Sequence, residues 1–455
     1  MISPLIAFGA ASIRQRTIYA LFCIFSVPTF RPYASRIGDR TAHRQVSGLS
    51  FQSLHRIDFF MTKQKVLFSH FVNAMTGCLI TTAALAQVAP DDRVFKTEQY
   101  TVRAVTVIAG LSHPWGMAFL PDGRMILTER RGTMRIVEDG KLVENPIEGI
   151  PQVSEHGQGG LMDVVLHPKY AENGWVYWTY NAGKPGEYGT ELARGKLGGT
   201  RSAPSMTNVE VLFRMSPKSS AGQHFGSRIV FDRNGYLFVT LGDRGDSPAK
   251  GAAHRAQQLN DHAGKSIRLH DDGRIPVDNP FIKTANAKPE IFTWGNRNMQ
   301  GAALHPETGQ LWAHEHGPQG GDEINILTAG SNYGWPVITY GANYGSGTKI
   351  GEGTTKAGIV APLHFWVPSI APSGMAFYTG NNFPKWKGNL FVGALANQSL
   401  VRLTLNGEKV VSEERMFEGK LGRFRDVRQG PDGNLYILTD APKGELIRLE
   451  IVKLG

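Results

Sequence analysis

His224 is the residue of this 455-residue chain whose type and position most suggest catalysis. It lies in the loop AGQHFGSR, just before two strand-like segments at 229–231 and 236–241. An unperturbed imidazole has a pKa of about 6.5, so it can accept a proton near neutral pH. A histidine beside a strand end is equally compatible with an ordinary polar loop. Its role therefore depends on which other loops the fold brings beside it.

Arginine and amide side chains occupy several other loops that lie next to strand-like segments. They are Gln158, Arg297, Asn298, Gln300, Arg423 and Arg425. Guanidinium groups gathered in one cavity repel each other unless an anion neutralises them, and they match carboxylates bidentately. If these loops converge, we expect a compact polyanion with several oxygens as the ligand. Taken singly, each arginine could instead be a solvated loop residue or a structural ion pair.

The loop HEHGPQGGDEIN raises the possibility of a metal site. Its glycines, from Gly317 to Gly321, force an irregular turn whose carbonyls have no regular strand partners. With Asp322 and Glu323 adjacent, such carbonyls suit a hard cation such as calcium. A plain glycine-rich turn capped by an acid fits the same sequence. The chain has no HExxH motif, CxxC pair or P-loop, so a zinc site or a nucleotide cradle has no support.

The elements that must position these loops recur six times. Each repeat consists of an apolar strand, a turn with Pro, Asp, Asn or Gly, and a second apolar strand. The repeats begin at Pro114, Gly160, Gly226, Gln300, Pro372 and Phe424. A glycine precedes each second strand, at Gly123, Gly174, Gly235, Gly309, Gly388 and Gly433. No segment has a long apolar repeat of helical period, which disfavours an α/β barrel.

We therefore predict an all-β fold, a six-bladed β-propeller. Blades usually recur every 40 to 50 residues or so, and the wider spacing here indicates insertions between blades, especially at 249–289 and 340–362. The strand-like segments 99–110 and 444–453 are expected to pair and close the ring. If the first strands of all repeats enter the central channel in the same sense, the loops before them meet at one end of the ring.

The N-terminal region is expected to direct export. Residues 61–86 read as a signal peptide, with Lys63 and Lys65 before an apolar stretch and small residues before Gln87. The protein is then periplasmic or secreted; a lipid anchor at Cys78 is the alternative. Residues 1–60 read as an upstream extension or a mis-assigned start, 87–98 as a linker, and 99–455 as the catalytic propeller. No membrane span is expected in the mature chain.

Charge and cysteine usage exclude other classes. The formal net charge is +10, but nine Lys and Arg against two acids precede Gln87. The remaining body is nearly neutral, so no nucleic-acid partner is expected. Both cysteines, Cys23 and Cys78, also lie in this first region. The mature domain therefore has no disulfide framework.

From residue 102 to residue 450 the motifs resemble, in order, the soluble pyrroloquinoline quinone (PQQ)-dependent sugar dehydrogenases, specifically their aldose sugar dehydrogenase branch. The pieces that carry the resemblance are GQGGLMDVVLHP, GQHFGSRIVFDRNGYLFVTLGDRG, WGNRNMQGAALHP, HEHGPQGGDEIN and RFRDVRQGPDGNLYILTD. Members of this family are six-bladed propellers that bind PQQ, a quinone with three carboxylates, together with calcium. This ligand fits the polyanion expected from the arginines.

The resemblance also implies residue roles. His224 would be the general base at the anomeric hydroxyl while hydride passes to the quinone, and Arg297 would support charge on the quinone oxygen. The carbonyls of Gly317 and Pro318 would hold the calcium beside it. The cofactor would be held by Gln158, His224, Arg297, Asn298, Gln300, Arg423 and Arg425. Glu323 and Tyr333 correspond to ligands of a separate structural calcium.

Two departures from the family's glucose-specific branch affect these expectations. That branch has a Lys-Arg pair where this chain has Ala396-Asn397, and an acid where this chain has Gln223. It also has long substrate-covering insertions that are missing here, which suggests broad aldose acceptance. We expect oxidation of aldoses to lactones with an external quinone or redox protein as electron acceptor, in a monomer or homodimer. The alternatives are a propeller lactonase and a non-catalytic sugar- or protein-binding propeller.

Overall fold

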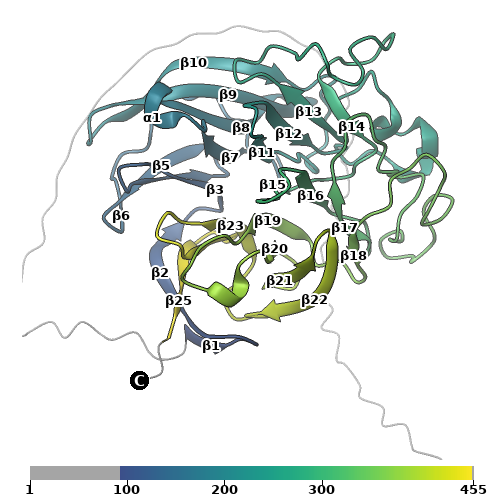
Figure 1. The fold of residues 1–455 in the computed structure, drawn as a ribbon. Helices are drawn as coiled ribbons and strands as arrows, with labels where there is room; N and C mark the ends of the chain where they lie inside the picture. The colour runs from purple at the N-terminus through teal and green to yellow at the C-terminus, as the bar shows by residue number, and fades with distance from the viewer. Residues whose placement is uncertain (1–92, 453–455) are drawn as a thin grey trace, which may run out of the picture. The chain divides into compact units, whose positions relative to one another are not determined.

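Six antiparallel sheets, one for each sequence repeat, surround a central channel in the computed structural model (Figure 1). The structure describes residues 93–452. The predicted extension at 1–60 and the predicted signal peptide at 61–86 lie outside this range. The prediction of an all-β six-bladed propeller is confirmed.

The first three blades each have four strands, which follow one another in chain order from the channel outward. Blade 1 contains β3 (Pro114–Phe119), β4 (Met125–Glu129), β5 (Thr133–Glu138) and β6 (Lys141–Leu142). Blade 2 contains β7 (Leu161–Leu166), β8 (Trp175–Lys184), β9 (Glu187–Gly199) and β10 (Pro204–Arg214). Blade 3 contains β11 (Ile229–Phe231), β12 (Leu237–Leu241), β13 (Lys265–Leu269) and β14 (Ile291–Trp294).

The next two blades follow the same plan. Blade 4 contains β15 (Gly301–Leu304), β16 (Leu311–Glu315), β17 (Asp322–Ile326) and β18 (His364–Trp366). Blade 5 contains β19 (Pro372–Phe377), β20 (Leu390–Ala394), β21 (Ser399–Asn406) and β22 (Lys409–Met416). Because every repeat begins with its innermost strand, the loops before these strands meet at one end of the channel. We call this end the mouth and the opposite end the far end.

Blade 6 joins the two termini of the described chain. Its strands β23 (Phe424–Gln429), β24 (Leu435–Thr439) and β25 (Gly444–Ile451) continue into β2 (Thr101–Leu111), which pairs with β25 from Val102 opposite Ile451 to Leu111 opposite Gly444. The expected closure of the ring is confirmed. A fifth strand, β1 (Val94–Lys96), pairs with the outer edge of β2. The interval predicted as a linker, 87–98, therefore contains part of the sheet, in a segment too short for strand alternation to be recognised.

The turns and the core explain why each repeat folds alike. The glycine before each second strand has a positive φ in all six blades, between 70° and 89°, which side chains other than glycine disfavour. Apolar side chains of neighbouring sheets pack together, so each sheet is covered on both faces. Between blades 1 and 2, for example, Ile126 and Ile136 share a cluster with Val176 and Trp178.

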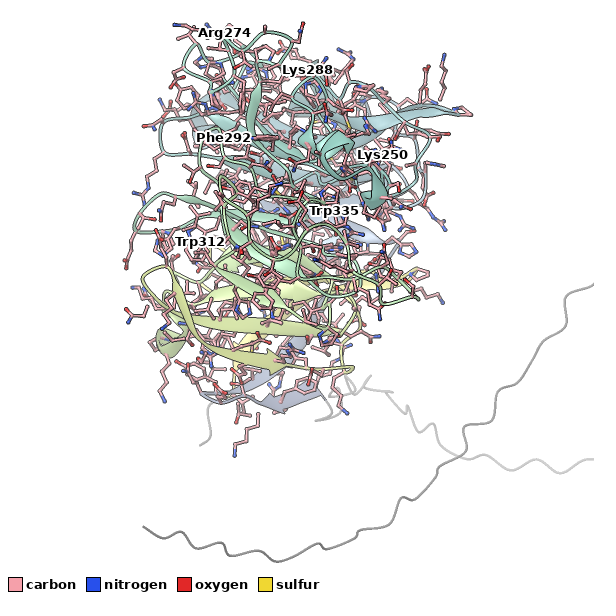
Figure 2. All side chains as sticks on the ribbon, turned by 90° about the vertical axis from the view of Figure 1, so that its right-hand side faces the viewer. Lys250, Arg274, Lys288, Phe292, Trp312 and Trp335 are labelled. Atoms are coloured by element: carbon pink, nitrogen blue, oxygen red, sulfur yellow. The ribbon has the colours of Figure 1, made fainter. Side chains whose placement is uncertain are left out.

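The extra length lies within blades, which corrects the expectation of insertions between them. In blade 3 the segment after β12 carries two short 3-10 helices, η2 (Pro248–Ala253) and η3 (Arg255–Gln257). In blade 4 the chain makes a long excursion from β17 to β18, and this excursion carries Trp335. In the side view, Trp335 and Lys250 lie toward one end of the ring, away from Phe292 and Trp312 (Figure 2). Both enlarged segments line a pocket at the mouth.

Helices are few and short. The α-helix α1 (Tyr170–Asn173) and the 3-10 helix η4 (Pro384–Trp386) complete the secondary structure of the described chain. Within residues 93–452 no helix combines the length and apolar composition that crossing a membrane requires.

Candidate active site

The loop between β10 and β11 holds His224 in a strained backbone conformation at the mouth. Its φ is 54°, a region that non-glycine residues rarely adopt. The backbone N–H of His224 donates to Oε1 of Gln158 from blade 2, at 3.0 Å. Arg244 donates to the carbonyl of His224 at 3.1 Å and stacks on the ring of Phe225 at 3.5 Å. These contacts hold the strained conformation in place.

Asp243 orients the imidazole. Nδ1 of His224 lies 2.6 Å from Oδ1 of Asp243, so the carboxylate accepts the Nδ1 proton and Nε2 is left as the basic nitrogen. Asp243 is fixed in turn by the indole N–H of Trp335, at 2.7 Å from Oδ2, and by the N–H of Gly245, at 2.8 Å from Oδ1. Burial lowers the pKa of His224, and the positive charge of Arg297 adds to this, while Asp243 opposes both. His224 is therefore a neutral base that is hydrogen-bonded to the buried carboxylate of Asp243.

His224 and Asp243 belong to a pocket of about 330 Å³. Its walls include Arg297, Pro318, Trp335 and Tyr344, so three of the predicted site residues, His224, Arg297 and Pro318, are brought together. The volume is in the range of small-molecule sites. Trp335 and Tyr344 come from the blade 4 excursion and were not predicted as site residues.

Arg297 lies between this pocket and the glycine-rich loop. Its Nη1 donates to the carbonyls of His316, at 3.0 Å, and Gly317, at 2.7 Å. The guanidinium carbon is 5.1 Å from the ring centre of Trp335. The backbone N–H of Arg297 donates to the carboxylate of Glu315. The side chain is therefore rigidly placed in the pocket wall.

The other two predicted arginines lie together around Asp440. Arg425 is buried, with Nη1 donating to Oε1 of Gln300 at 2.6 Å and Nη2 donating to Oδ2 of Asp440 at 2.8 Å. Arg423 is exposed and lies 3.7 Å from the same carboxylate. One acid thus serves two guanidinium groups, which leaves excess positive charge. Arg130, which was not predicted as a site residue, lies nearby and has its own partner, Glu155, at 3.6 Å. Burial lowers the pKa of Arg425, and the charges of Arg423 and Arg130 lower it further, while Asp440 opposes them.

Several buried hydrogen-bond donors at the mouth have no acceptor among the residues that the structure describes. They are Nδ2 of Asn298, Nε of Arg297 and Nε of Arg425. Oδ1 of Asn298 already accepts from Gly226 at 3.1 Å. Leaving a buried donor unpaired costs about 1–3 kcal/mol, so this set calls for an oxygen-rich ligand. The donor surplus and the positive charge together fit a compact polycarboxylate such as PQQ.

The glycine-rich loop between β16 and β17 only partly matches the predicted cation site. The carbonyl of Gly317 already accepts from Arg297, which leaves one lone pair for a metal. Asp322 is not free to bind a cation, because it accepts from the N–H groups of Gly317, Ile370 and Ala371 at 2.7–2.8 Å. It instead anchors the loop to the entrance of blade 5.

Glu323 and Tyr333 lie with Glu315 around a very small buried cavity under Arg297. Glu315 and Glu323 are cross-strand neighbours on β16 and β17. Burial raises the pKa of both carboxyl groups, and their proximity raises that of Glu323 further. The hydroxyl of Tyr333 donates to the carbonyl of Ile326, so its own carbonyl is what remains for a cation. Two buried carboxyl groups that form no ion pair within the described residues fit a divalent cation.

The departure at Ala396-Asn397 lies beside Arg423. Nη1 of Arg423 donates to the carbonyl of Leu395 at 3.1 Å, and the N–H of Ala396 donates to Ile370 at 3.0 Å. The main chain at this departure thus contacts both Arg423 and Ile370.

The chain resembles known enzymes over most of its length. The family profile described as "Glucose / Sorbosone dehydrogenase" matches residues 111–448. The aldose sugar dehydrogenase YliI of Escherichia coli (strain K12) is 46% identical over 353 residues, which cover 77% of this chain and 93% of that protein. The crystal structure of the soluble aldose sugar dehydrogenase from Escherichia coli in the apo form has 45% identity and a TM-score of 0.73, and covers 77% of this chain and 100% of its own.

A solved structure of a more distant relative contains a ligand. The PQQ-bound form of the aldose sugar dehydrogenase from Streptomyces coelicolor has 26% identity and a TM-score of 0.62, and covers 79% of this chain and 100% of its own. The family profile and the 46% identical relative together decide the classification. This chain is a member of the glucose/sorbosone dehydrogenase family of enzymes.

Proposed function

We propose that the protein oxidises the anomeric carbon of aldose sugars to lactones, in a reaction that depends on PQQ and calcium. The observation that carries the proposal is the pairing of a neutral histidine base with a positively charged, donor-rich surface at one end of the ring. PQQ, when bound, would supply the acceptor for the hydride of the anomeric carbon.

His224 takes the proton from the anomeric hydroxyl at its Nε2. Asp243 supports this step because it holds the proton on Nδ1 and stabilises the imidazolium that forms. Proton removal raises the electron density on the anomeric oxygen, which favours departure of hydride from the same carbon. Trp335 keeps Asp243 in position through its indole N–H.

Two groups of residues would hold the cofactor. Arg297 and Asn298 offer their free donors on one side, and Arg425 with Arg423 offers positive charge on the other. Gln300 links Arg425 to the strand entrance of blade 4, and Gln158 steadies the His224 loop. Carboxylates suit these groups because guanidinium binds them in a bidentate manner.

Calcium would bind at the carbonyls of Gly317 and Pro318, next to the pocket, and a second ion would bind at Glu323 and Tyr333. The first ion, when bound, would supply Lewis-acid polarisation of an acceptor oxygen, a role that hard cations perform. The second would neutralise the buried Glu315 and Glu323 pair and so support the residues beneath Arg297.

The test is dye reduction by the purified protein with a panel of aldoses, with and without added PQQ and calcium. Dye reduction that requires both additions supports the proposal, and substrate breadth follows from the panel. The lactonase alternative predicts lactone hydrolysis without PQQ. The mouth favours it less, because Asp243 and Asp440 are already paired with imidazole, indole or guanidinium groups. Absence of both activities would support a binding propeller. Export to the periplasm and an external quinone or redox protein as acceptor are part of the proposal.

A further inference from the structure

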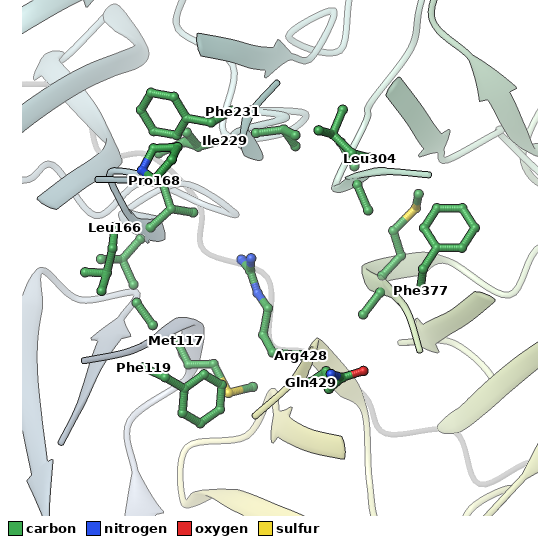
Figure 3. Close-up of a pocket in the computed structure, with 18 of the residues that line it drawn as sticks. Met117, Phe119, Leu166, Pro168, Ile229, Phe231, Leu304, Phe377, Arg428 and Gln429 are labelled. Carbon is green, nitrogen blue, oxygen red and sulfur yellow. The ribbon is translucent and has the colours of Figure 1, made fainter. Parts of the chain in front are cut away.

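A second cavity lies at the far end of the channel. It has a volume of about 500 Å³ and is lined by the inner strands of all the blades. Its walls are mainly apolar, with Phe119, Phe231 and Phe377 around the periphery (Figure 3). It extends beyond the strand ends to the exposed Thr379. Preformed, mostly apolar cavities of this size with a few polar groups are typical of small-molecule sites.

Arg428 provides the polar group at the centre of this cavity. Figure 3 shows its side chain reaching into the middle of the ring. Its Nε donates to Asp426 at 3.0 Å and its Nη2 donates to Asp163 at 2.7 Å. No acceptor for Nη1 occurs among the described residues, and the side chain keeps 23% of its exposure. One strong donor therefore remains available inside an apolar space.

The cavity is separate from the mouth. Arg228 donates to Asp163 at 3.0 Å and to Asp426 at 2.9 Å, and together with Arg428 these residues link blades 2, 3 and 6 across the channel. Gln300 lies on the mouth side of this group, where its carbonyl accepts from Arg228 and its side chain accepts from Arg425. A molecule in the far cavity would thus not compete for the His224 pocket.

The charge of the ion group indicates what the cavity binds. Two arginines and two aspartates balance formally, so an anion would lose its hydration without gaining a net counter-charge. A neutral oxygen acceptor has a smaller desolvation cost and still receives a hydrogen bond from a charged donor. We propose that the far cavity is a binding site for a neutral aromatic carbonyl compound whose oxygen accepts from Arg428. This site is independent of the proposed function, since it needs neither PQQ nor sugar.

The test uses the methyl groups of methionine as reporters. Met117 and Met375 line the cavity, whereas Met162 packs with Trp115 and Phe225. The protein, labelled with ¹³C at the methionine methyls, is titrated with acetophenone, with ethylbenzene and with benzoate. We expect acetophenone to shift Met117 and Met375 but not Met162, and to bind about tenfold more tightly than ethylbenzene, in line with one hydrogen bond from a charged donor. Benzoate is expected to bind more weakly than acetophenone.

Two variants fill the cavity without touching the ion group. Ala376→Phe and Ala303→Phe, from blades 5 and 4, are each expected to abolish the acetophenone shifts, while Ala285→Phe on an exposed loop leaves them unchanged. A filled variant whose Met162 signal keeps its wild-type position is folded. One folded variant is enough for the test. The proposal would be overturned if acetophenone failed to shift Met117 and Met375, or if ethylbenzene bound equally tightly. It would also be overturned if benzoate bound more tightly than acetophenone, or if the shifts survived in both filled variants.

Discussion

At the scale of single residues, the proposed chemistry depends on His224 being neutral and oriented by Asp243. Replacing the imidazole with an amide of similar reach removes the base but keeps a polar group in the loop. We expect His224→Gln to lower kcat by about two to four orders of magnitude while PQQ still binds. Steady-state dye reduction measures the first quantity, and quenching of protein fluorescence by PQQ measures the second. The control is His270→Gln, because the His270 ring packs near that of Tyr236 and does not line the pocket. This variant should keep full turnover.

The pH dependence of catalysis should report the same pair. The pKa of His224 is lowered by burial, raised by Asp243, and lowered by Arg297 and Arg244. Asp243→Asn removes the raising contribution, so protonation of the base occurs at lower pH, and the acid limb of kcat/KM should move to lower pH. The wrong tautomer should also reduce kcat by about 10²- to 10⁴-fold. The role of Asp243 would be contradicted if the acid limb of kcat/KM did not move in Asp243→Asn. It would also be contradicted if the limb moved equally far in the control variant Asp246→Asn.

The sequence predicts His224 as the base, but it does not predict Asp243 as the hydrogen-bond partner. Asp243 stands in the same motif, after strand β12, yet an acid following a strand and a glycine looks like any turn residue. Only the β11 to β12 hairpin brings the two together. The predicted hairpin brings the end of its second strand back beside the start of its first strand. An acid at the end of the second strand was therefore the signal that could have identified Asp243 as a neighbour of His224. Arg130 could not be found in this way, since its nearness to Arg425 requires blades 1 and 6 to meet.

At the scale of elements, the six repeats can be recognised in the sequence because every blade needs the same strand, glycine turn and second strand. The pattern predicts that the loops before the inner strands meet at one end of the channel, and the common strand order of the blades agrees with this. It did not reveal β1, whose three residues are too few to show alternation, nor the path of the blade 4 excursion that delivers Trp335. Irregular segments follow from tertiary contacts rather than from periodicity, which is why their side chains were missed.

The loop from Gly317 to Gly321 offers a test at this scale. A Cβ on Gly317 would lie 2.2 Å from the carbonyl oxygen of Gly320, so Gly317→Ala must displace the loop. We expect the free energy of unfolding to fall by about 1–3 kcal/mol, and calcium-dependent activity to fall with it. Gly353→Ala is a matched control, because its Cβ would meet nothing within 4 Å. Stability is measured by urea unfolding and the calcium response by calcium titration of activity. Equal values in the two variants would show that neither property depends on the conformation of this loop.

At the scale of the whole molecule, the ring is held by closure through β2 and β25 and by the buried ions in the channel. Asp426 accepts from Arg228 and Arg428, so Asp426→Asn leaves the buried Arg228 and the half-buried Arg428 on a single aspartate, Asp163. We expect the free energy of unfolding to drop by about 3–5 kcal/mol. Glu352→Gln, which breaks the exposed pair with Lys356, should cost less than about 1 kcal/mol. Similar losses for both variants in urea would mean that the channel ions do not join the blades.

The central claim is that the mouth binds PQQ beside a histidine base. Single-turnover absorbance of the PQQ-loaded protein on mixing with aldose tests it most directly, in the wild type and in His224→Gln at equal occupancy. The account predicts rapid reduction of bound PQQ in the wild type and reduction at least about 100-fold slower in the variant. Equal rates, or PQQ that binds but is never reduced by any aldose, would contradict it.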